Sequence, residues 1–195
     1  MLYDIVQVGD PVLRRRARPV APEEIGTPFL QELIASMRIT MYDAPGVGLA
    51  APQVGESLQV VVAEDEGEHL EIMSPARRAE LRRDELPFTA LINPMLEPVG
   101  DETEEFFEGC LSVEGYSALV RRFRRVRVEA LDPAGRPFSM DVEGWPARIL
   151  QHELDHLAGI LYIDRMDART FTTNGNLGRW WKARTAADVR SGLTE

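Results

Sequence analysis

Two histidines stand four residues apart in the segment QHELDHLAG, residues 151–159. On an α-helix, residues i and i+4 lie one above the other on the same face, so His152 and His156 can share one metal ion. Glu153 would stand beside that ion as a base, as in HExxH metalloenzymes. A purely structural histidine pair is the alternative. Because the chain holds only three histidines, the spacing favours a metal site.

Two imidazoles alone do not complete the ligand shell of a zinc or iron ion. The remaining histidine, His69, lies in a highly charged stretch, and we interpret it as a solvated side chain. The other candidate is Cys110, the only cysteine. A lone cysteine cannot form an internal disulfide and is most often a small buried residue. As a ligand it would give three protein ligands and an open fourth position, which is typical of catalytic metal sites.

The composition is that of a globular protein with 195 residues and a formal charge of −10. This charge argues against non-specific nucleic-acid binding, and no apolar run is long enough for a membrane span. The start, MLYDIVQVGD, has no basic region followed by an apolar core, so we expect a cytoplasmic protein. Two arginine runs, at residues 14–18 and 121–125, are interpreted as solvated strand edges. Contact with an acidic partner such as ribosomal RNA is the alternative.

The elements that must position the histidines and the cysteine follow from hydrophobic periodicity. A helix is expected over residues 22–42, with Pro22, Glu23 and Glu24 in its first turn. Its apolar residues at helical spacing are Phe29, Leu30, Leu33, Ile34, Met37 and Met41. Strands are expected in the segments 57–64 and 88–96, and in the second segment Asn93–Pro94 is expected to end the strand. A hairpin is expected on both sides of the turn at 132–135.

After Gly144 the pattern becomes helical, with Trp145, Ile149 and Leu150 on the apolar side and Gly159 as the terminator. The sequence therefore predicts an α+β fold, with antiparallel strands and hairpins packed around a central helix that carries HExxH. We expect one domain over residues 1–195. It has a charged excursion at 64–86, with a short helix from Ser74–Pro75 through Arg83, and a peripheral C-terminal tail from about residue 176.

Three motifs resemble those of the peptide deformylases, in the order and with the intervals of that family. They are GVGLAAPQ at 46–53, EGCLS at 108–112 and QHELDHLAG at 151–159. The segments GWPARILQHE and RTFTT are similar to the branch that includes plant and mitochondrial forms. One residue departs from the family pattern, since Glu114 stands where EGCLSVPG has proline. That change falls on the rim of the expected substrate cleft.

The resemblance implies removal of the N-terminal formyl group from nascent polypeptides that begin with formyl-methionine. Cys110, His152 and His156 would bind the metal, and Glu153 would be the general acid/base. Gln53, through its side-chain amide, and Leu111, through its backbone N–H, would bind the oxygen of the attacked formyl group. A metal-bound water would be the nucleophile, because the metal lowers its pKa to about 7. Ferrous iron is the implied native ion, and zinc, nickel or cobalt can replace it.

Further residues are expected around this centre. The glycine-bearing segment 46–53 is either an ordinary turn or, as Gln53 favours, a strand that holds the substrate backbone. Trp145 and Ile149 are core residues or walls of the methionine pocket. The residues expected to bind substrate are Gly46, Val47, Gly48, Gly109, Trp145 and Ile149. The residues expected to support the ligands, rather than to be plain surface charges, are Glu108, Asp155 and Arg122.

Three other functions fit parts of the pattern. A zincin-type endoprotease lacks a histidine after His156 and leaves Cys110 and Gln53 unexplained. A cysteine hydrolase with Cys110 as nucleophile leaves one histidine without a role. A non-enzymatic metal-binding module that docks on the ribosome does not explain Glu153 and Gln53. The deformylase prediction includes formyl-methionine nascent peptides and a transient ribosome contact as partners, with no membrane and no specific nucleic acid.

Overall fold

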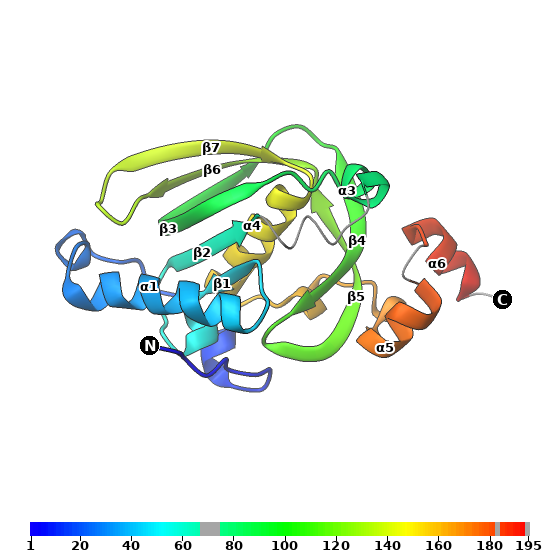
Figure 1. The fold of residues 1–195 in the computed structure, drawn as a ribbon, viewed down its shortest axis with the longest axis horizontal. Coiled ribbons are helices and arrows are strands. Elements are labelled where there is room, and N and C mark those ends of the chain that lie inside the picture. Colours follow the sequence, from blue (N-terminus) through cyan, green and yellow to red (C-terminus); the bar gives the residue numbers. More distant parts are fainter. Residues whose placement is uncertain (67–74, 182–183, 194–195) are drawn as a thin grey trace.

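The computed structural model describes residues 1–66, 75–181 and 184–193, and it has an α+β fold with two antiparallel sheets (Figure 1). The larger sheet has the strand order β1-β2-β3-β6-β7. Its strands are β1 Gly48–Ala50, β2 Val60–Asp65, β3 Leu86–Pro98, β6 Arg125–Leu131 and β7 Pro137–Glu143. The smaller sheet contains β4 Thr103–Cys110, β5 Val113–Phe123 and β8 Thr172–Thr173. All neighbouring strands are antiparallel, as predicted.

The helix that carries both histidines is α4, Trp145–Leu157. It begins after Gly144, has a proline in its first turn, and ends at Leu157, followed by the capping residue Ala158 and by Gly159 at a φ of +75°. Glycine is favoured there because a side chain is strained at positive φ. The buried side of α4 contacts strands of both sheets, so the helix lies where the two sheets meet. This position brings α4 next to the end of β4.

The first long helix is shorter than predicted. α1 spans Pro28–Asp43, and its first backbone N–H groups are capped by Thr27, whose hydroxyl accepts from Leu30 N. Residues Pro22–Glu24 form a separate 3-10 turn, which Gly26 at a φ of +83° divides from α1. The predicted start at Pro22 was therefore wrong. Phe29 is 52% exposed, whereas the other predicted core residues of this helix are buried.

Strand β3 continues through the point where the sequence predicted its end. Asn93 has a φ of +51°, and the pairing with β6 shifts register between Ile92 and Met95. The Asn93 side chain donates to Val20 O and accepts from Val20 N, both at 2.8 Å, which holds this bulge in place. A proline is tolerated at such a bulge because no ladder hydrogen bond is needed from it.

The charged excursion expected at 64–86 is bounded by strands, because Asp65 belongs to β2 and Leu86 to β3. Between them lies the short helix α3, Pro75–Leu81. His69 and Ser74 fall outside the described residues. No helix in the described ranges is long and apolar enough to cross a membrane.

The hairpin around residues 132–135 is formed by β6 and β7, as predicted. Residues 118–123, which the alternation of apolar and charged residues also assigned to this hairpin, belong instead to β5 of the smaller sheet, and Arg122 is only 5% exposed. The interpretation of the run 121–125 as a solvated edge was therefore wrong for Arg122. In the run 14–18, Arg14 pairs with Asp164 at the surface.

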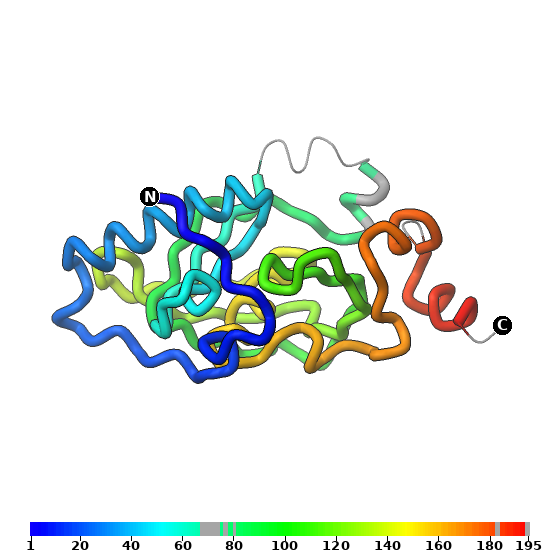
Figure 2. The backbone as a smooth tube through the Cα atoms, turned by 90° about the horizontal axis from the view of Figure 1, so that it is seen from below, coloured from blue at the N-terminus to red at the C-terminus, as the bar shows by residue number. Residues whose placement is uncertain are grey.

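The C-terminal part after β8 consists of α5 Asn174–Asn176, a π-helical turn Leu177–Trp181 and α6 Ala186–Gly192. Figure 2 shows this part at one end of the molecule, beside the smaller sheet. The N-terminal segment crosses the same view near the hairpin between β4 and β5. Both termini therefore bring short segments close to the end of β4.

Candidate active site

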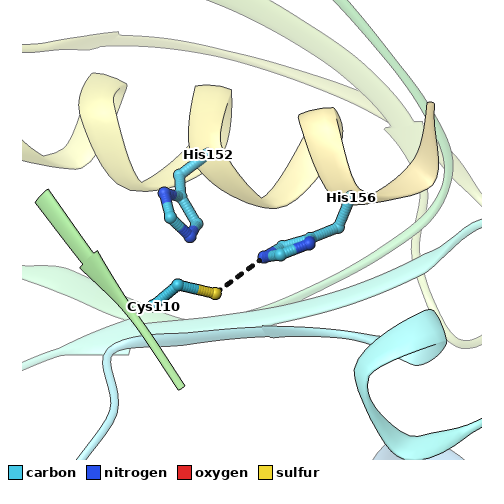
Figure 3. Close-up of side chains that lie close together, drawn as sticks. All are labelled: Cys110, His152 and His156. Carbon is cyan, nitrogen blue, oxygen red and sulfur yellow. Dashed lines mark hydrogen bonds between the residues drawn. The ribbon is translucent and has the colours of Figure 1, made fainter. Parts of the chain in front are cut away.

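Cys110, His152 and His156 come together from two elements. Cys110 is the last residue of β4, directly before the turn that leads into β5, and the histidines project from adjacent turns of α4. Figure 3 shows the three side chains pointing toward one another. One potential ligand atom from each lies within 4.8 Å of the others, and His156 Nε2 is 3.3 Å from Cys110 Sγ. A thiolate with two imidazoles is a donor set for iron(II), zinc, cobalt or nickel.

Glu108 fixes the orientation of His152. His152 Nδ1 lies 3.1 Å from Glu108 Oε2, which leaves the other ring nitrogen directed toward Cys110. A carboxylate behind a ligand histidine selects its tautomer and increases its basicity. Burial raises the pKa of Glu108, but hydrogen bonds from His152 and Arg122 outweigh burial and hold that pKa well below its usual value. Glu108 is therefore an anion at neutral pH.

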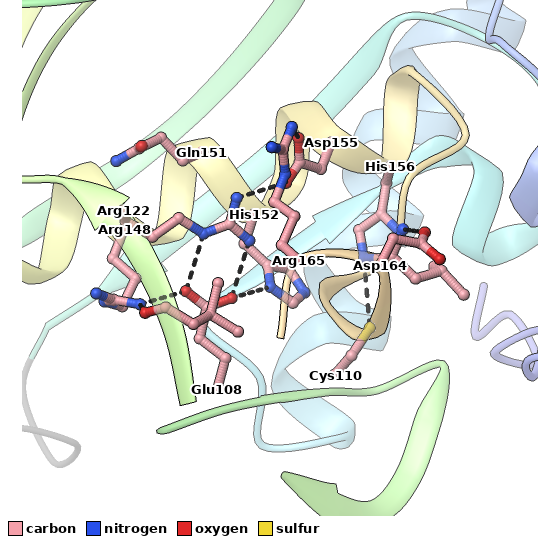
Figure 4. Close-up of polar contacts among 12 residues, drawn as sticks. Glu108, Cys110, Arg122, Arg148, Gln151, His152, Asp155, His156, Asp164 and Arg165 are labelled. Atoms are coloured by element: carbon pink, nitrogen blue, oxygen red, sulfur yellow. Dashed lines mark hydrogen bonds and ion pairs between the residues drawn. The ribbon is translucent and has the colours of Figure 1, made fainter. Parts of the chain in front are cut away.

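Buried ion pairs connect Glu108 to Asp155 (Figure 4). Arg122 donates to both Glu108 oxygens, at 3.0 and 2.9 Å, and also to Asp155. Arg165 donates to the two oxygens of Asp155 at 2.6 and 2.7 Å. The structure thus brings Glu108, Asp155 and Arg122 together behind the histidines. Removing one charge from such a network leaves the others unpaired, which is costly in a buried site.

Arg148 is a member of this network that sequence reasoning missed. Its guanidinium pairs with Glu108 and donates to Val120 O at 3.0 Å and to Glu104 O at 2.8 Å. These bonds connect α4 to both long strands of the smaller sheet. The signal in the sequence is a single arginine one helical turn before His152, on the same face of the helix.

Gln53 faces the thiol with its amide nitrogen. Ala50 N donates to Gln53 Oε1 at 2.8 Å, so the Nε2 group must point the other way, toward Ser112 Oγ at 3.2 Å and Cys110 Sγ at 3.6 Å. Gln53 is 1% exposed, and Pro52 beside it in the 3-10 turn Ala51–Val54 restricts the backbone. The amide donor is therefore held in one orientation beside the cysteine.

Glu153 is buried and has one unused oxygen. It is 5% exposed, and no described residue is a hydrogen-bond partner of its Oε2. Burial raises the pKa of Glu153 to about 7, while the charge of His152 acts in the opposite direction. The carboxyl also lies directly against Gly48, where an added Cβ would be 2.7 Å from Glu153 Cδ and 2.8 Å from Cγ. Gly48 thus provides the space that the carboxyl occupies.

Gly48→Ala should displace this carboxyl. The added methyl group overlaps Glu153, and the glutamate side chain is the part that can move. A displacement of about 1 Å near a reacting group costs on the order of a hundredfold in rate, so we expect that loss in turnover with metal content unchanged. Gly178→Ala is the matched control, because nothing lies within 4 Å of its added Cβ. Equal turnover of both variants would show that the Glu153 position does not matter.

A cleft of about 670 Å³ opens over these groups. The lining residues include all those expected to bind substrate: Gly46, Val47, Gly48, Gly109, Trp145 and Ile149. Gln53, Cys110, Leu111, His152 and Glu153 also line it. Asp155 and Arg122 do not line it, and ion pairs connect them to Glu108 behind it. Ile5, Gln7 and Asn174, from the two terminal segments, complete the wall and were not found from the sequence.

Comparison with known proteins gives one consistent family. A family model described as "Polypeptide deformylase" matches residues 2–171. "Peptide deformylase 1A, chloroplastic" of Solanum lycopersicum is 49% identical over 177 residues, which cover 89% of this chain and 63% of that protein. "Peptide deformylase 3" of Streptomyces avermitilis is 46% identical over 189 residues, which cover 97% of this chain and 82% of that protein.

Solved structures of the same family share the fold. A Met-Ala-Ser-bound class I type b peptide deformylase from Acinetobacter baumannii superimposes with a TM-score of 0.75 at 32% identity, covering 85% of this chain and 99% of that one. A peptide deformylase from Thermotoga maritima gives a TM-score of 0.71 at 38% identity, covering 86% and 99% of the two chains. The two sheets and the helix that carries the histidines are thus placed in a known architecture.

Proposed function

The chain belongs to the peptide deformylase family, and we propose that it removes the N-terminal formyl group from formyl-methionine at the start of nascent polypeptides. The observation that carries this proposal is the convergence of Cys110, His152 and His156 beside a cleft that is lined by Cys110, His152 and Glu153. Three protein ligands leave one coordination position for water or substrate. Cys110, His152 and His156 would hold the metal, which would supply a water nucleophile at neutral pH by lowering the pKa of that water. The enzyme is a metal-dependent hydrolase of an N-terminal amide.

Glu153 is the general acid/base. Its unpartnered Oε2 takes the proton of the attacking water and then delivers it to the leaving amine. Gln53 Nε2 and Leu111 N–H stabilise the oxyanion that forms on the formyl group. The orientation of Gln53 supports this role, because the bond from Ala50 N to Oε1 keeps the amide nitrogen on the side of Cys110.

The substrate peptide binds along β1. This strand is at the edge of the larger sheet, and Gly46, Val47 and Gly48 line the cleft beside it. An extended peptide can add to such an edge through backbone hydrogen bonds. Trp145, Ile149 and Gly109 form the walls that receive the methionine side chain. In this arrangement α4, which contacts both sheets, is the centre of the fold and of the site.

The native metal in this proposal is iron(II), with zinc, nickel or cobalt able to replace it. All four ions accept thiolate and imidazole, so availability in the cell helps to decide among them. We further propose that the enzyme works in the cytoplasm, in transient contact with the ribosome as formylated chains emerge. Metal analysis of anaerobically purified protein tests the identity of the metal. Co-sedimentation with ribosomes tests the ribosome contact.

The central experiment compares three peptides. The metal-loaded enzyme should hydrolyse formyl-Met-Ala-Ser at least a hundredfold faster than acetyl-Met-Ala-Ser, and should not cleave a longer unformylated peptide. Acetyl carries a methyl group where formyl carries hydrogen. We expect little space for that methyl group between the ligands, Gln53 and Leu111, and displacement of the reacting carbon by about 1 Å costs on the order of a hundredfold.

Rate constants for release of formate, acetate and internal fragments decide the outcome. Similar rates on all three peptides would contradict a deformylase and support an endoprotease. Binding of metal without turnover of any peptide would support a non-enzymatic metal-binding module. A rate advantage confined to the formyl peptide supports the proposal, and it also shows that the enzyme acts only at chain ends.

A further inference from the structure

The N-terminal segment, residues 5–8, is hydrogen-bonded to both stretches of chain that supply the oxyanion donors. Val6 N donates to Gln53 O at 2.9 Å, and Val8 N donates to Ser112 O at 2.7 Å. These are bonds between residues far apart in the sequence, and they place segment 5–8 between the Gln53 turn and the turn after β4 (Figure 2). Any motion of one turn relative to the other must stretch these bonds.

The side chain of Gln7 spans the turn that follows Cys110. Its Nε2 donates to Leu111 O at 2.9 Å and to Ile5 O at 3.3 Å, and its Oε1 accepts from Glu114 N at 3.4 Å. One amide thus bonds the backbone on both sides of the turn. Cys110 pairs with Val113 across this turn, so only Leu111 and Ser112 form its tip. The proposed metal ligand and the proposed oxyanion donor are consecutive residues there.

We propose that Gln7 is a positioning residue that holds the turn 110–114 in the conformation needed for catalysis. Its bond to Leu111 O limits rotation of the peptide group between Leu111 and Ser112, and its bond from Glu114 N restrains the other end of the turn. Leu111 N–H and Cys110 then keep their placement relative to Gln53, which the bond from Val6 fixes from the other side. This inference rests on the proposed deformylase function, because it assigns Leu111 N–H to the oxyanion.

Gln7 is exposed, so its effect on the conformation of the turn can be tested apart from its effect on the stability of the whole protein. Water competes for an exposed hydrogen bond, so its net contribution to folding is small. The same bond can still select one backbone conformation of a two-residue tip. Loss of Gln7 should therefore change the site without unfolding the protein.

The test uses Gln7→Ala and Gln7→Glu, with Gln31→Ala as the matched control. Gln31 is also an exposed glutamine that donates to a backbone carbonyl, Pro133 O at 2.9 Å, but it lies on α1 outside the cleft. Gln7→Glu keeps the side-chain length and the acceptor but loses the donor to Leu111 O. Metal content, kcat and KM on formyl-Met-Ala-Ser, and amide hydrogen exchange over residues 107–115 are measured for each.

Both Gln7 variants should retain metal and show about a tenfold lower kcat, with KM within about twofold, because a displacement smaller than 1 Å costs less than a hundredfold. Amide exchange over 107–115 should become faster in both and stay unchanged in Gln31→Ala. Unchanged exchange, or faster exchange with normal kcat, would overturn the proposal. A rise in KM alone would also overturn it, since Gln7 would then be a contact for the peptide.

The exchange measurement does not depend on deformylation. If the wild-type enzyme has no activity on the formyl peptide while Gln7 variants show faster exchange, the proposed function fails and the structural role of Gln7 stands. If the wild type is active and the variants show neither effect, the proposed function stands and the role of Gln7 is rejected.

Discussion

Glu153→Gln should keep its metal and lose turnover by about a thousandfold, within the range of effects typical of a general acid/base. Glutamine has the size of glutamate, so it fits the space beside Gly48 without steric change. An amide cannot take a proton from water at neutral pH. Because Glu153 contributes no ligand atom to the group formed by Cys110, His152 and His156, metal retention should not change.

Metal content and kcat on formyl-Met-Ala-Ser are measured on the same preparation. Glu64→Gln is a suitable control, because Glu64 is also a buried glutamate but pairs with Arg38 of α1, and neither residue lines the cleft. It should bind metal and turn over substrate as the wild type does. Near-normal kcat in metal-loaded Glu153→Gln would remove Glu153 from the reaction.

The parts of the site that were predictable from sequence are those that local geometry fixes. Four residues on a helix place His152 and His156 on one face whatever surrounds them. The chemistry of a three-ligand site then selected Cys110, because no other thiol exists and His69 lies in a charged stretch. Strand alternation around residues 132–135 likewise identified the β6–β7 hairpin without tertiary information.

Other parts depend on tertiary contacts, and the sequence carries little signal for them. Arg122 was expected near the ligands, but it lies in an arginine run typical of a solvated edge, and its burial depends on pairing with Glu108 and Asp155. The bulge at Asn93 depends on the side-chain bonds to Val20, 73 residues away. Gln7 is separated from Leu111 by 104 residues, so only the folded chain reveals their hydrogen bond.

Cys110→Ser should lose metal, with affinity at least tenfold lower. A thiolate is a soft, charged ligand, whereas a serine hydroxyl stays protonated at neutral pH and binds these ions weakly. Two donors already face this sulfur: Ser112 N donates to Cys110 Sγ at 3.4 Å and Gln53 Nε2 donates at 3.6 Å. Turnover should fall in parallel with metal content. Ser112→Ala is the control, since it changes the same turn but keeps all three ligands, and it should retain metal.

The single cysteine allows a second, direct measurement on the unmodified protein. A thiol reagent can react only with Cys110, so its rate reports on that sulfur alone. In the metal-loaded enzyme the reaction should be slow, and a chelator that removes the metal should accelerate it at least tenfold, because a coordinated sulfur is a poor nucleophile. If Cys110 were instead a catalytic nucleophile, the thiol would react at the same rate with and without chelator. Mass spectrometry would then also detect a formyl group on Cys110 during turnover, an intermediate that a metal-ligand role does not produce.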